Sequence, residues 1–178
     1  MRRILFVCLW VFVVAPVAAL AAAPLSSGDG TLAVRDGDGL VKAQLPTGVI
    51  LGRIEDGELR VFDPDVDCDD LNRTTVWNND DMDVRFVAPR TGPRQTPSSP
   101  RRVPVCVFST GDEPMRFRLL DEGNVRVRGS GIWISAVGRG RAWVEGKTSK
   151  ANDGKYSVNG ASFKSLPDDG QWVDVKGS

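Results

Sequence analysis

The chain has 178 residues, with 23 basic and 23 acidic side chains and no histidine. This balanced charge argues against nucleic acid as the main partner, because proteins that bind nucleic acid usually carry a basic excess. The absence of histidine excludes Ser-His-Asp and Cys-His triads, histidine-bearing zinc sites and two-His-one-carboxylate iron sites. No nucleophile elbow or glycine-rich phosphate loop is found either. We therefore expect a protein that is not an enzyme.

Residues 1–23 have the features of a signal peptide. Two arginines precede an apolar run over 4–14, and small residues that fit a cleavage site follow, up to Ala23. The apolar run is shorter than the roughly 20 residues of a transmembrane helix. We expect an exported protein, located extracellularly or at the cell envelope, with no stable membrane span after cleavage. Retention of the segment as an anchor is the alternative.

The remainder, 24–178, has a size that suits a single domain with a hydrophobic core. Apolar and polar residues alternate in short stretches bounded by glycine, as at 57–62, 123–129 and 140–146. This period of two predicts half-buried β-strands. We expect an all-β domain of roughly ten to twelve short strands, arranged as an antiparallel sandwich or barrel. A short β-solenoid is the alternative.

Residues 48–61 align without a gap on residues 131–144, so that glycines and apolar residues coincide. We interpret this as an internal repeat of two related β units, about 30–63 and about 105–178. Chance similarity between two glycine-bounded hairpins is the alternative. The connector between the units, about 64–104, is acidic and then rich in proline and arginine. Its proline-rich part, 89–104, predicts an exposed extended loop.

The dipeptide Asn159-Gly160 separates the expected strands 155–158 and 161–164. Both residues tolerate positive φ angles, so this dipeptide predicts a hairpin with a type I′ turn.

Two cysteines, Cys68 and Cys106, remain after the signal peptide. An even number of cysteines in an exported chain predicts a disulfide, which would restrain the connector. Two free buried thiols are the alternative. The pair does not suffice for a zinc site, because no histidine or further cysteine completes the ligand set.

Four carboxylates alternate along the acidic part of the connector: Asp63, Asp65, Asp67 and Asp69. Closely spaced carboxylates are ligands that calcium prefers, so this segment is a candidate calcium site. The EF-hand pattern fails, because Cys68 stands where the loop requires glycine. A solvated acidic loop is the alternative, and no other cofactor is expected.

Two tryptophans alternate with residues that are expected to face the core. If Ala142 and Val144 point inward, Trp143 points outward, and Trp133 does the same on the preceding strand. Together with Arg126 and Arg128 they form a candidate binding face for sugar rings or for another protein. The alternative is that a second layer covers these rings and makes them core residues.

The stretches 129–140, 154–160 and 163–167 resemble a group of small secreted proteins of high-GC Gram-positive bacteria. The resemblance covers most of the chain after the signal peptide and is strongest over about 115–167. It implies export and a β fold, and it implies no particular activity. We therefore expect an exported non-catalytic protein with a structural or protein-interaction role at the cell envelope or outside the cell. A cell-wall glycan-binding module is the alternative.

Overall fold

The computed structural model describes residues 28–62, 68, 76–77, 83–87, 105–120, 124–147 and 153–177. The strands in this part of the chain are β1 (Gly30–Ile54), β2 (Asp56–Phe62), β3 (Val76–Trp77), β4 (Asp83–Val87), β5 (Val105–Ser109), β6 (Met115–Leu120), β7 (Asn124–Gly146), β8 (Lys155–Val158), β9 (Lys164–Ser165) and β10 (Gln171–Val175).

The all-β prediction is confirmed. Every strand pairing among the described residues is antiparallel, and the bonded path of strands is not closed into a barrel. The antiparallel pairing contradicts the solenoid alternative, which needs parallel coils. The strands differ from expectation in length, because β1 has 25 residues and β7 has 23. Glycines that were expected to end short strands instead bend two long ones.

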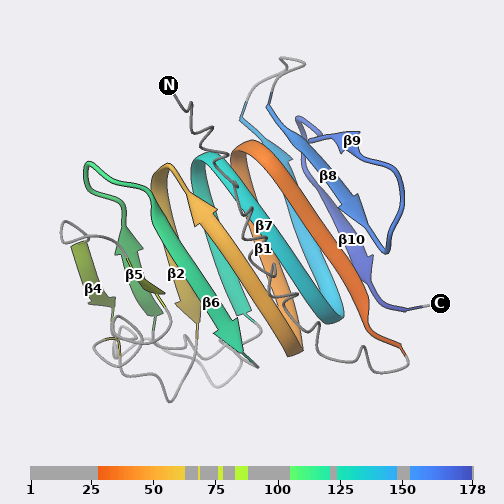
Figure 1. Ribbon diagram of the computed structural model, residues 1–178, viewed down its shortest axis with the longest axis horizontal. Coiled ribbons are helices and arrows are strands. Elements are labelled where there is room, and N and C mark those ends of the chain that lie inside the picture. The colour runs from red at the N-terminus through yellow and green to blue at the C-terminus, as the bar shows by residue number, and fades with distance from the viewer. Residues whose placement is uncertain are drawn as a thin grey trace, which may run out of the picture.

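The two long strands pass back and forth between two layers, which makes the fold a sandwich (Figure 1). We call the first layer A. Its strand segments, in the order in which they pair, are β8, β1 over 30–35, β7 over 131–138, β1 over 47–54, β6 and β3. We call the second layer B. Its strand segments, in the order in which they pair, are β10, β7 over 140–146, β1 over 39–44, β7 over 124–129, β2, β5 and β4.

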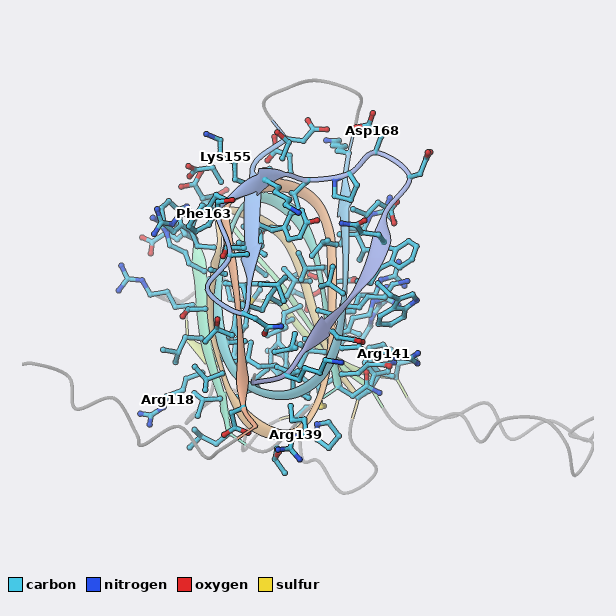
Figure 2. The ribbon with its side chains drawn as sticks, turned by 90° about the vertical axis from the view of Figure 1, so that its right-hand side faces the viewer. Arg118, Arg139, Arg141, Lys155, Phe163 and Asp168 are labelled. Atoms are coloured by element: carbon cyan, nitrogen blue, oxygen red, sulfur yellow. A yellow bond between two sulfur atoms is a disulfide. The ribbon has the colours of Figure 1, made fainter. Side chains whose placement is uncertain are left out.

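The hydrophobic core lies between the two layers. Alternate residues of each strand point inward, as the burial pattern of β6 and β7 shows. Viewed from the side, ribbons of the two layers enclose the apolar side chains (Figure 2). The largest fully buried side chains are Phe108, Phe117, Leu32, Leu45, Ile54, Leu59, Met115, Leu119, Ile132, Val34, Val41 and Val61.

The backbones of the neighbouring strands β2 and β7 approach closely where β7 bends. Gly57 and Gly129 are paired across β2 and β7, and their φ angles are +149° and +156°. A Cβ atom at Gly129 would lie 2.1 Å from the carbonyl oxygen of Asp56. No residue with a side chain fits this position, so glycine is needed there for space as well as for backbone conformation.

The turn at Asn159-Gly160 is confirmed in its backbone conformation, with φ angles of +52° and +74°. The strand that follows is shorter and later than predicted, since β9 covers Lys164–Ser165 and pairs with Lys155 and Tyr156. The Asn159 side chain fixes the turn to two other segments of the chain. Its Oδ1 atom accepts hydrogen bonds from the backbone N–H groups of Thr31 and Lys176, and its Nδ2 atom donates one to the Asp174 carbonyl.

We expect Asn159→Ala to lower the free energy of unfolding by about 2 kcal/mol, because it removes three side-chain hydrogen bonds and strains a residue with positive φ. Urea denaturation followed by circular dichroism measures this change. Asn159→Asp is the matched control. It keeps the Oδ1 acceptor and the tolerance for positive φ but loses the donor, so a loss equal to that of alanine would contradict the assignment.

The chain is not organised as two separate units joined by a loop. Strand β1 belongs to the first expected unit, and it pairs with β6, β7 and β8 of the second. Two short strands, β3 and β4, lie within the connector, before its proline-rich part. The signal peptide, the proline-rich part of the connector and Asp63, Asp65, Asp67 and Asp69 lie outside the described residues.

The Cys68–Cys106 disulfide is confirmed, with a Cα–Cα distance of 5.5 Å. Cys106 lies on β5 and is fully buried in the core, and Cys68 is also buried. The bridge therefore fixes one point of the connector to layer B. Within the ranges given above, no helix is long and apolar enough to cross a bilayer.

Candidate ligand-binding surface

Trp133 and Trp143 point outward, as expected, but from different layers. Trp133 lies on the layer A part of β7, where it pairs with Arg53 of β1. Trp143 lies on the layer B part, where it pairs with Lys42. The chain crosses between the layers in the intervening bend at 138–140. The expectation that both rings share one face is therefore wrong, because outward has opposite directions in the two layers.

A row of aromatic and basic residues crosses the outer face of layer B. Successive partners in register are Trp172 on β10, Trp143 on β7, Lys42 on β1, Arg126 on β7 and Arg60 on β2. Directly opposed residues of an antiparallel sheet point to the same side. The row crosses five neighbouring strand segments, which corresponds to about 19 Å at the usual spacing of strands. Three of the four predicted binding residues, Trp143, Arg126 and Arg128, lie on this face.

The aromatic end of the row is held in place by its neighbours. The rings of Trp143 and Trp172 meet edge to face, with centroids 5.7 Å apart. The Nε1 atom of Trp143 donates a hydrogen bond of 2.7 Å to Glu145. The Arg141 guanidinium lies 4.3 Å from the centroid of Trp172, and the Lys42 ammonium lies 5.3 Å from that of Trp143. These contacts leave Trp172 as the more accessible ring, with 43% exposure.

The basic end of the row opens into a hollow of about 640 Å³. Its walls carry the cationic side chains of Arg60, Arg126, Arg128 and Lys147 and the carboxylates of Asp56, Glu58 and Glu145. Glycines at 39, 57, 129 and 146 also line it, and their lack of side chains leaves room for the cavity. The hollow therefore combines hydrogen-bond donors and acceptors of both charges.

The cations that line the hollow differ in whether an ion pair already neutralises their charge. The Nε atom of Arg60 donates a hydrogen bond to Glu58 within an ion pair. Neither Arg126 nor Arg128 forms an ion pair with a residue in the described part of the chain. Their guanidinium groups are thus the ones available to a carboxylate or phosphate, which they can bind through two parallel hydrogen bonds.

Three residues of the row were not singled out in the sequence: Lys42, Arg60 and Trp172. Arg60 lies in the expected strand at 57–62. Lys42 and Trp172 lie in stretches with the alternation of a strand, at 39–45 and 171–175, so their outward direction could have been predicted. Their place beside Trp143 could not, because it depends on which strands are neighbours. Among the described residues, no cluster of three or more His, Cys, Asp or Glu side chains could hold a metal ion.

No protein-family model, curated protein or solved structure matches this chain.

Proposed function

We propose that this protein is an exported, non-catalytic binding protein of the cell envelope or the extracellular space, and that its ligand is a cell-wall glycan bearing acidic groups. The ligand would lie along the outer face of layer B. The observation that carries this proposal is the row from Trp172 to Arg126, in which an exposed aromatic ring lies on the same face as cations that form no ion pair with a described residue.

The chemistry of the row matches that of a sugar chain. The flat face of a tryptophan ring packs against the apolar face of a sugar, and its N–H group adds a polar contact. Guanidinium groups bind carboxylates or phosphates in fixed geometry. The polar side chains of Gln44 and Asn124 lie next to Arg141 and Arg126 on the same face and supply further hydrogen bonds. The length of the row favours a polymer over a single small molecule.

Export is part of the proposal and is supported by two features. Residues 1–23 carry the pattern of a signal peptide. The Cys68–Cys106 disulfide is of the kind that forms and persists in oxidising compartments.

The internal repeat is also proposed, and the strand pairing supports it. The stretches that align in sequence, 48–54 and 131–137, are direct neighbours in layer A. The aligned stretches that follow occupy matching places in layer B, where 57–61 pairs with 125–129 of β7 and 141–144 pairs with 41–44 of β1. Each unit thus contributes a strand segment that pairs with the other unit. We infer that two copies of one unit are interleaved about an approximate twofold axis.

Binding of the exported protein to a polyuronate and to neutral dextran tests the proposed ligand class. We expect binding to the polyuronate alone, weakened by added salt because the cations of the row are exposed. Trp172→Ala and Arg126→Gln should each weaken the affinity about tenfold, equivalent to about 1.4 kcal/mol.

Two control variants separate this face from the rest of the surface. Arg118→Gln removes an exposed cation of β6 on the outer face of layer A, and Trp133→Ala removes the tryptophan of the same layer. Both should bind the polyuronate with unchanged affinity. Equal binding by all four variants, or no binding by the unmodified protein, would refute the proposal.

A further inference from the structure

We infer that the outer face of layer A docks onto an anionic lipid surface. This inference does not depend on the proposed glycan site, which lies on layer B. It rests on a patch of three neighbouring strand segments, which we call the layer A patch; its outward residues are Trp133, Ser135 and Val137 of β7, Val49, Leu51 and Arg53 of β1, and Arg116, Arg118 and Leu120 of β6.

The patch exposes an unusual amount of apolar side chain. Leu120 is 49% exposed, Leu51 45% and Trp133 41%. The register places Leu120 beside Val49, and Val49 beside Val137, in one row across the three segments. Leu51 lies in the next row. Because opposed residues of an antiparallel pair are in contact, these side chains form a continuous apolar area.

Cations border this apolar area. Arg53 lies between Trp133 and Arg116, and Arg118 lies beside Leu51. Next to the patch, Lys155 of β8 lies opposite Arg35 of β1 in the strand register. The Arg35 guanidinium lies over the exposed ring of Phe163, 4.3 Å from the ring centroid. Figure 2 shows Lys155, Phe163 and Arg118 on one side of the molecule and Arg141 of layer B on the other.

Among the described strand residues of this face, no outward side chain is negatively charged. None of the outward residues of the patch is acidic, and neither are the adjoining outward residues of β1 and β8, Thr31, Ala33, Arg35, Lys155 and Ser157. Glu55, at the end of the patch, pairs with Arg53 at 3.4 Å, and both side chains are exposed.

An anionic bilayer fits this combination better than other occupants. Tryptophan and aliphatic side chains partition into the region of lipid headgroups, and neighbouring cations bind anionic lipids. A second copy of the same face would bring arginines against arginines across a twofold axis, which is repulsive. A glycan would leave the leucine and valine side chains without a favourable contact. The patch is therefore assigned to a lipid surface.

Co-sedimentation of the exported protein with vesicles tests this inference. We expect binding to vesicles of equal parts phosphatidylcholine and phosphatidylglycerol, little binding to phosphatidylcholine alone, and release by high salt. Arg116→Gln/Arg118→Gln and, separately, Leu120→Ser should each lower the partition coefficient at least tenfold. The substituted side chains are exposed, and unchanged urea midpoints confirm that the variants fold.

The matched control is Arg85→Gln/Lys176→Gln, which removes the same charge from exposed positions outside the patch and should bind as the unmodified protein does. Any contribution from residues 4–14, if they are retained, is common to all variants and cancels in the comparison. Tryptophan fluorescence should shift to the blue on binding, and Trp133→Phe should abolish the shift. Absence of binding to the anionic vesicles, or an equal loss in the control and the patch variants, would overturn the inference.

Discussion

Gly129→Ala is expected to prevent the protein from reaching its folded state. A Cβ atom at this position would lie 2.1 Å from the Asp56 carbonyl oxygen and 2.8 Å from the Cα atom of Gly57. Both are backbone atoms at a bend, so the clash cannot be relieved by turning a side chain. Its φ angle of +156° adds conformational strain. We expect a loss of more than about 4 kcal/mol, which is most of the stability of a typical small domain.

Gly160→Ala is the control that measures the cost of a positive φ angle without a steric clash. Gly160 has a φ angle of +74°, and a Cβ atom there would meet nothing within 4 Å. We expect a loss of only about 1–2 kcal/mol, as for any residue forced into the left-handed region. Urea denaturation of the two variants measures the difference. Equal stability of Gly129→Ala and Gly160→Ala would show that the close approach at the bend is not needed for the fold.

Removal of the disulfide is expected to have the second largest effect. The bridge spans 38 residues, and the loop-entropy relation assigns about 4 kcal/mol to closing a loop of that length. The cost should appear as a lower urea midpoint for Cys68→Ala/Cys106→Ala, because both cysteines are buried and alanine introduces no polar group into the core.

The reducing agent supplies an internal control for this experiment. Dithiothreitol should lower the midpoint of the unmodified protein toward that of the double variant and leave the variant itself unchanged. Identical midpoints for the oxidised and fully reduced protein, with reduction verified by mass spectrometry, would contradict a stabilising role for the bridge.

Alternation in the sequence predicted which residues are buried far better than it predicted where strands end. Val125 and Val127, and likewise Ala142 and Val144, point into the core as expected. Glycine was taken as a strand boundary, whereas β1 and β7 continue through several glycines with altered φ angles. A glycine permits a bend as well as a turn, and the sequence does not distinguish these outcomes, because the choice depends on the partner strand.

The candidate binding surface could be predicted only in part, for a related reason. A period of two tells that Trp133 and Trp143 point away from the core, but it does not tell to which layer each belongs. The register separates them and joins Trp143 to Trp172 and Lys42, which are about 30 and 100 positions away in the chain. Such neighbours arise from the pairing of distant strands, which local patterns do not encode.

The interleaving of β1 with later strands has a consequence for how the chain acquires its structure. The described strands that pair with β1 lie beyond residue 114, so these pairings of β1 form only after most of the polypeptide has been synthesised. Contacts between residues so distant in sequence make folding slow, on the order of milliseconds to seconds for β proteins of this kind. A truncation that ended before β6 would keep the pairing of β2 and β4 with β5 but would leave β1 without its described partners and exposed to aggregation.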